Sequence, residues 1–348
     1  MTPRKLLTIG LASATLLGAC HRKDKDGTEE DPGTTEASAV YYRNSIPRGE
    51  TVMVRVPGAS ANGQALTVET QSQALTVAQG QTADLYKLTW AANTIFNGGA
   101  ILVLGLVKTV VGFPPTTLTA DTAVWGPWTG DHDPITWKVT VTRKGDHLYA
   151  YTFEGRDRNA PSAPFVTVLS GEHTPALDAS GRPVEGFGSG NFTLDNDARQ
   201  TLPMPGADVG KAHYTYERSA PAAMVFVDAQ FMQVKDDERP GQLVDLGYSY
   251  RATLGSGGNM QFLHSAPASM TSAGTIWKIK SRWLETGAGR SDVVGSGGDI
   301  PAGMSVNLSE CWDTSFASRY QKLSWTPLFS WGTEATDCVF TSAEYSTL

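Results

Sequence analysis

The chain has 348 residues, of which 40% are hydrophobic and 18% are charged, so it is too apolar for a disordered protein and can form a core. Its 36 Gly and 19 Pro follow no Gly-X-Y period and accompany many aromatic residues, which excludes collagen and disfavours a bundle of long helices. The formal net charge of −7 argues against a nucleic-acid-binding protein, because such proteins neutralise phosphates with Lys and Arg.

The chain begins with a pattern that is typical of an export signal. Arg4 and Lys5 precede the uncharged, mostly apolar run 6–17, and small residues follow it. A basic start, about a dozen apolar residues and a small-residue cleavage site define a secretory signal peptide, and such a run is too short to span a bilayer. We therefore expect residues 1–19 to be a signal peptide.

The segment Leu17-Gly18-Ala19-Cys20 resembles the lipobox of bacterial lipoproteins. In that family the Cys thiol receives a diacylglyceryl group and the chain is cut just before it. The resemblance implies that Cys20 is the mature N-terminus and a stable membrane anchor, since each buried CH₂ contributes about 0.8 kcal/mol. The alternative is an ordinary signal peptide that ends near a Cys. His21, rather than Asp, follows Cys20, and the family's sorting pattern then implies the outer membrane of the cell envelope.

The next residues are polar and charged as far as Ser38, without a large apolar side chain. Such a segment cannot offset the entropy cost of ordering. Residues 20–38 are therefore predicted to be a lipidated Cys and a flexible tether, and residues 39–348 a single β-rich domain.

The stretch from Val40 to Val77 has short alternating apolar runs, such as Val52, Val54 and Val56, separated by Pro and Gly. This alternation predicts one or two hairpins.

The region from about 84 to 112 is the most apolar outside the signal, and Pro114-Pro115 ends it. Its uncharged length leaves a membrane span open as an alternative. Asn93 and Asn97, however, share one helical face, which favours a helix that packs on a sheet. We expect a buried helix here.

After Pro115 the pattern changes to alternating strands joined by short turns with Gly, Pro or Asp. It predicts about eleven strands in an antiparallel meander, curved into a half-barrel or barrel-like sheet and covered by the helix. The strands are expected at Ile135–Val141, His147–Phe153, Phe165–Leu169, Phe187–Leu194, Ala212–Glu217, Ala222–Val234, Leu243–Leu254, Asn259–Leu263, Thr275–Leu284, Arg290–Val294 and Met304–Leu308.

This layout resembles the half-barrel and helical lid of the lipoprotein carriers LolA and LolB, although those domains are much shorter. No motif residue matches, so the resemblance assigns no functional residue. The chain is also similar to uncharacterised envelope lipoproteins, which implies no activity.

Cys311 and Cys338 remain as an even pair in an exported chain, which predicts a disulfide. Closing a loop of about 28 residues would contribute roughly 3.6 kcal/mol. Two buried free thiols or a metal pair are the alternatives, but no His follows His264 to complete a zinc site.

Other candidate chemistry is sparse. No Gly-x-Ser-x-Gly motif occurs. Asp131-His132-Asp133 and Asp195-Asn196-Asp197 carry metal-ligand residue types, but consecutive residues rarely bind one ion, and turns are the favoured interpretation. Trp125, Trp128 and the tryptophans near the two cysteines fit core packing better than a sugar- or lipid-binding platform. We expect no catalytic residue, metal or cofactor.

These patterns predict a non-catalytic, membrane-anchored envelope lipoprotein that binds a hydrophobic ligand between helix and sheet, or a partner protein. The alternative is a hydrolase that acts on envelope polymers and uses paired carboxylates in a cleft.

Overall fold

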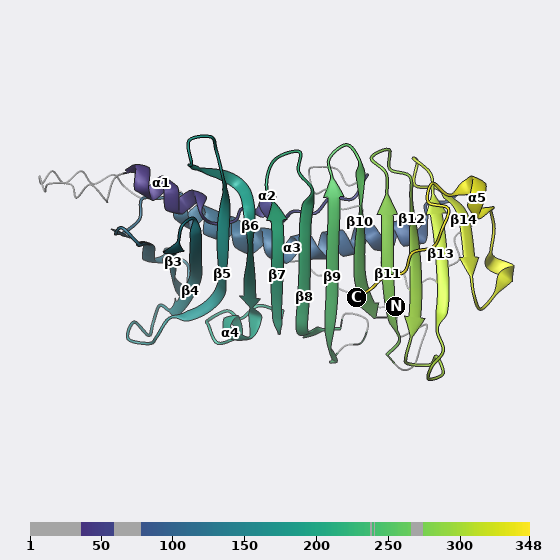
Figure 1. The fold of residues 1–348 in the computed structure, drawn as a ribbon. Helices are drawn as coiled ribbons and strands as arrows, with labels where there is room; N and C mark the ends of the chain where they lie inside the picture. Colours follow the sequence, from purple (N-terminus) through teal and green to yellow (C-terminus); the bar gives the residue numbers. More distant parts are fainter. Residues whose placement is uncertain (1–35, 59–77, 237–238, 240, 266–273) are drawn as a thin grey trace, which may run out of the picture.

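The computed structural model describes residues 36–58, 78–236, 239, 241–265 and 274–348. Within these ranges fourteen antiparallel strands form one curved, open sheet, and each strand pairs with its neighbours in sequence (Figure 1). The strands are β1 (Thr117–Leu118), β2 (Thr122–Thr129), β3 (Ile135–Gly145), β4 (Leu148–Asp157), β5 (Val166–Leu177), β6 (Pro183–Asp195), β7 (Lys211–Arg218), β8 (Val225–Lys235), β9 (Leu243–Thr253), β10 (Gly257–Ser265), β11 (Ile276–Trp283), β12 (Gly289–Ser296), β13 (Val306–Trp312) and β14 (Ser318–Leu323). The predicted antiparallel meander of half-barrel shape is confirmed.

The alternation of side chains separates the two faces of this sheet. On β4, Tyr149, Tyr151 and Phe153 are buried in the main core, whereas Thr152 between them points the other way. The same period of two recurs on β7, where buried Tyr214 and Tyr216 alternate with exposed Thr215 and Glu217. One face therefore carries the core, and the opposite, convex face carries mostly polar side chains.

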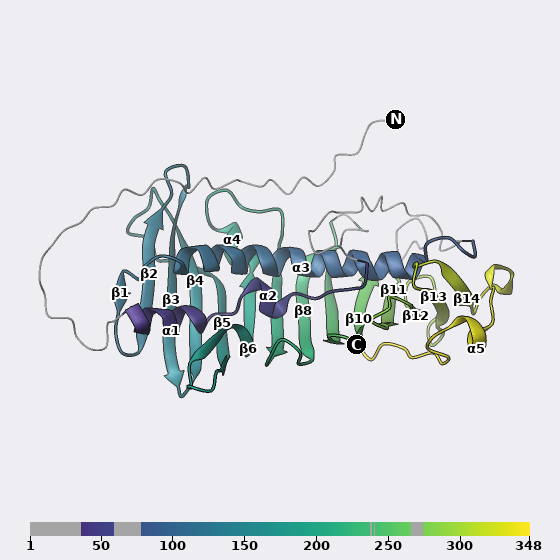
Figure 2. The ribbon, with the colours of Figure 1, turned by 90° about the horizontal axis from the view of Figure 1, so that it is seen from above.

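Helix α3 (Asp84–Val111) covers the core face and runs across the strands (Figure 2). Its first turn lies at the β13–β14 end, where the Leu85 amide donates to Glu310 at 2.7 Å. Its last turn lies near β2, where the Trp125 indole donates to the Phe113 carbonyl at 2.8 Å. The predicted buried helix at about 84–112 is confirmed. Within the described ranges, no helix combines the length and the apolar character needed to cross a bilayer.

The prediction of hairpins over 40–77 is wrong for the part that the structure describes. Residues 36–58 contain α1 (Glu36–Asn44), α2 (Gly49–Val52) and no strand. Val54 lies outside any helix or strand, and the side chain of Asn97 on α3 pairs with its backbone, accepting from the amide at 3.0 Å and donating to the carbonyl at 2.9 Å. An amide side chain thus takes the place of a partner strand. Residues 59–77 lie outside the described ranges.

The structure describes only a part of the region to which the N-terminal predictions apply. Residues 1–35, which include Cys20 and the lipobox-like segment, lie outside the described ranges. Helix α1 begins at Glu36, within the last three residues of the predicted tether of residues 20–38. Tyr42 explains this early start, because its buried ring packs edge-on against Tyr149, 5.9 Å between centroids.

Three strands had not been predicted from the sequence. β1 has only two residues, β2 contains the Gly126-Pro127 cis peptide bond and a register shift, and β14 is largely polar. Proline inside a strand and weak alternation both hide the period of two. Short helices α4 (Asn196–Gln200), η1 (Pro327–Phe329) and α5 (Glu334–Asp337) complete the fold.

Both edges of the sheet are protected from pairing with another chain. β1 is very short. At the other edge, Gly80 and Gln81 exchange backbone hydrogen bonds with Ser318, and Trp331 exchanges two with Gln321. Short or covered edges prevent edge-to-edge association.

Candidate functional site

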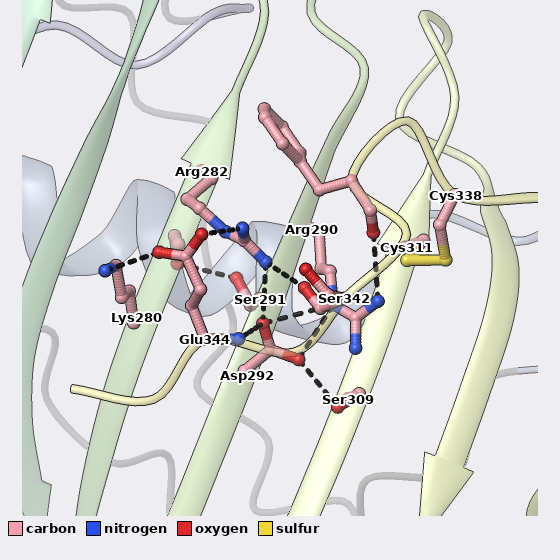
Figure 3. Close-up of polar contacts among 12 residues, drawn as sticks. Lys280, Arg282, Arg290, Ser291, Asp292, Ser309, Cys311, Cys338, Ser342 and Glu344 are labelled. Atoms are coloured by element: carbon pink, nitrogen blue, oxygen red, sulfur yellow. Dashed lines mark hydrogen bonds and ion pairs between the residues drawn. A yellow bond between two sulfur atoms is a disulfide. The ribbon is translucent and has the colours of Figure 1, made fainter. Parts of the chain in front are cut away.

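Buried charged side chains gather on the convex face of β11–β13, beneath residues 339–348, which we call the strap (Figure 3). Alternation along β11 places Lys278, Lys280 and Arg282 on this face, and alternation along β12 adds Arg290 and Asp292. In the described part of the chain, no group of three or more His, Cys, Asp or Glu could hold a metal ion.

A disulfide fixes the start of the strap. Cys311 on β13 is bonded to Cys338, which directly follows α5, and their Cα atoms are 5.4 Å apart. Tyr320 of β14 packs against both cysteines. The predicted Cys311–Cys338 pairing is confirmed. Strand β14, η1 and α5 all lie within the loop that this disulfide closes.

Replacing Cys338 with Ser in a Cys20→Ser background should lower the free energy of unfolding by about 3–4 kcal/mol, because the unfolded chain regains the entropy of the open loop. Urea denaturation followed by tryptophan fluorescence measures this loss. Dithiothreitol should produce the same loss in the Cys20→Ser parent and none in the double variant. A loss below about 1 kcal/mol would contradict the prediction.

Asp292 is the centre of the buried charges. It is fully buried, and its carboxylate accepts from Arg290 Nε at 2.8 Å and from Arg282 Nη2 at 3.1 Å. The Ser309 hydroxyl donates to it at 2.7 Å, and the Glu344 backbone amide donates at 3.0 Å. One buried carboxylate therefore joins three strands to the strap.

The strap is held largely through its main chain. Arg290 donates to the Phe340 carbonyl at 2.9 Å, and Arg282 donates to the Ser342 carbonyl at 2.6 Å. Farther along, the Thr347 amide donates to the Gln261 side chain at 2.8 Å, and Lys278 donates to the Leu348 carbonyl at 2.5 Å. These contacts lay the strap across β10–β13.

Electrostatics favour the charged forms of Glu344 and Arg290. The Glu344 carboxylate bridges Lys280 at 2.8 Å and Arg282 at 2.5 Å, and its pKa is lowered, first by the hydrogen bond from Lys280 and also by Arg282, against partial burial. Burial acts to lower the pKa of Arg290, but Asp292 and Glu334 raise it above its usual value. The site consists of matched ion pairs.

A shallow pocket of about 280 Å³ opens beside these ion pairs. Phe340 and Glu344 of the strap line this pocket together with Ser256, Gly258, Asn259, Lys280, Arg282, Trp283 and Leu284. The Arg282 guanidinium lies 4.9 Å from the Phe340 ring centroid, so the two side chains form a cation–π contact.

A second polar group is buried on the core face of the same strands. Glu310 of β13 is almost fully buried, and burial raises its pKa to about 7, with the charge of Asp84 adding to the effect. One oxygen accepts from Leu85, whereas no partner is found for the other. Nearby, the hydroxyls of Thr89, Ser281 and Ser291 form a chain with 2.6 Å at each step. This group supports the first turn of α3.

The other candidates from the sequence are structural. Asp133 accepts from the Ile135 amide and the Trp137 indole, so its cluster forms a turn. Asp195 caps α4 while it pairs with Lys211, so the second cluster begins a short helix rather than the predicted turn. Trp125 and Trp312 are buried in the core, as expected, whereas Trp325 is 44% exposed. The tryptophans are not gathered into one platform around the disulfide.

Sequence reasoning missed Arg282, Arg290, Asp292 and Glu344. Two signals were present: cations at 278, 280 and 282, and the pair Arg290 and Asp292, each spaced by two within a predicted strand. That spacing places charges on one sheet face. It does not reveal the strap that covers them.

In comparisons with known proteins, no protein-family model, no curated protein and no solved structure matches the chain.

Proposed function

We propose that this protein is a non-catalytic envelope lipoprotein, anchored in the outer membrane by lipid on Cys20, that binds a partner protein on its surface. The export signal and the lipobox-like segment support the anchor. The disulfide supports an oxidising compartment, where such bonds persist.

The packing between α3 and the sheet is the observation that favours a partner protein over a hydrophobic ligand. Phe96 stacks on Tyr248 with 4.1 Å between centroids, and Leu104 and Val107 of α3 are at most 1% exposed within the main core. Ligand cavities usually need about 300–1,000 Å³. The close packing of these side chains supports recognition at the surface.

The pocket chemistry does not favour the hydrolase alternative. A glycosidase needs one carboxyl group that stays protonated to act as an acid. Glu344 is the carboxylate of this pocket, and Lys280 and Arg282 lower its pKa. It is therefore a poor proton donor.

Replacing Cys20 with Ser should release the protein from the membrane, because the acyl chains supply the anchoring energy. Cell fractionation should find the wild-type chain with outer membranes and the variant in the soluble fraction, and mass spectrometry should find acyl mass on Cys20. The disulfide variant Cys338→Ser, which keeps Cys20, serves as the matched control and should stay with the membrane. An unmodified Cys20 in membrane-purified protein would overturn the lipoprotein proposal.

Native mass spectrometry of the Cys20→Ser protein distinguishes a partner protein from a hydrophobic ligand. We expect the mass of the polypeptide alone. A co-purified lipid of defined mass would instead favour the hydrophobic-ligand function and contradict the surface-binding proposal.

A further inference from the structure

The strap behaves chemically like a bound peptide. Residues 339–348 belong to no helix or strand. They are held because side chains of the convex face bind strap backbone atoms at Phe340, Ser342, Glu344, Thr347 and Leu348. Recognition through the backbone accepts many extended sequences, since every residue supplies the same groups.

The surface beneath the strap is cationic. Lys278, Lys280, Arg282 and Arg290 line it, and Asp292 is the one carboxylate that meets the strap there among the described contacts. The strap contributes Glu344, whose carboxylate joins Lys280 to Arg282. Charge complementarity therefore selects an extended segment with an acidic residue at this position.

We propose that this strip is a docking groove for an extended acidic segment of a partner protein, and that the strap occupies the groove until the partner displaces it. The inference rests on the proposed surface-binding function and names the chemistry of the partner.

The distribution of exposure makes displacement feasible. Arg282 and Lys280 are 9% and 18% exposed at their side chains, whereas Glu344 is 49% exposed. Val339 and Tyr345 of the strap are also exposed, at 46% and 38%. The groove side is thus buried and fixed in the sheet, while the strap lies outermost, and the disulfide at Cys338 holds the start of the strap beside β13 when the rest is displaced.

The experiment uses the full chain and a fluorescent peptide with the sequence of residues 339–348. Glu344→Lys places a cation against Lys280 and Arg282, so the strap should be held less tightly and should compete less for the groove. Fluorescence anisotropy should then show peptide binding at least about tenfold tighter than to the wild-type chain, whose strap competes at high effective concentration. Equal affinities of the two chains would overturn the proposal.

A charge swap provides the matched control. Lys280→Glu combined with Glu344→Lys restores the ion pair between positions 280 and 344 and places a carboxylate in the groove that repels the acidic peptide. Peptide affinity should therefore fall by about tenfold from that of Glu344→Lys. A peptide with Lys in place of Glu should bind Glu344→Lys poorly. Peptide binding that is unaffected by the charge swap or by the Lys-containing peptide would contradict a groove for an acidic segment.

The two proposals fail separately. Peptide binding is measured on purified protein, so it does not depend on Cys20. If the peptide does not bind and Cys20 is lipidated, the groove proposal is wrong and the lipoprotein proposal stands. Thermal unfolding of Glu344→Lys serves as the control that the sheet is intact.

Discussion

Asp292→Asn is expected to lower the free energy of unfolding by about 3–5 kcal/mol, because it leaves buried guanidinium groups without their shared anion. Arg290 and Arg282 are both buried, and Asp292 is fully inaccessible. Asn keeps the shape of the side chain, so the loss reports charge and hydrogen bonding rather than a cavity. Urea denaturation at neutral pH measures it.

Asp228→Asn is the matched control for this loss. Asp228 on β8 also pairs with an Arg through two hydrogen bonds, at 2.9 and 3.0 Å from Arg251, but its side chain is 40% exposed. Water solvates that pair, so its loss should cost less than about 1 kcal/mol. Similar losses at the two positions would show that burial does not set the energy of the Asp292 group.

Glu310→Gln should stabilise the protein at pH 8 and leave it almost unchanged at pH 4. The pKa of Glu310 is raised from 4.5 to about 7 in the fold, so the folded chain retains a proton that the unfolded chain releases between these values. Stability is therefore fully present below pH 4.5 and declines as the pH rises to about 7. A shift of this size corresponds to about 3 kcal/mol.

The measurement is the free energy of unfolding as a function of pH for the wild type, for Glu310→Gln and for Glu217→Gln, a control on the exposed positions of β7. Gln can still accept from the Leu85 amide, so the first turn of α3 keeps its partner. The Glu310→Gln curve should be flatter than the other two between pH 4.5 and 7. Parallel curves would disprove a protonated Glu310 in the fold.

The sequence predicted the parts of this fold that depend on local periodicity. Tyr149, Tyr151 and Phe153 alternate strongly enough to define β4, and the long apolar run that Pro114 ends defines α3. Val54 shows the limit of this reasoning. Its alternation indicates extended backbone, but only the tertiary structure shows that Asn97 is the group that pairs with it.

The candidate site was less predictable, because its parts lie far apart in the chain. The disulfide could be predicted from the even number of cysteines that remain in an exported chain, and it is confirmed. The contact between Arg282 and Glu344 joins residues 62 positions apart, and the bond from Arg290 to Phe340 spans 50. No pattern within a single strand encodes such distant partners.

The placement of α3 before every strand has a consequence for folding. Each strand from β2 onward pairs with the one synthesised just before it, so the sheet can grow in chain order over a helix that already exists. The first turn of that helix meets β13 through a hydrogen bond between Leu85 and Glu310 that spans 225 positions. Completion of β13 therefore closes this long loop, and a chain stopped before it would leave Leu85 in the first turn of the helix without its partner.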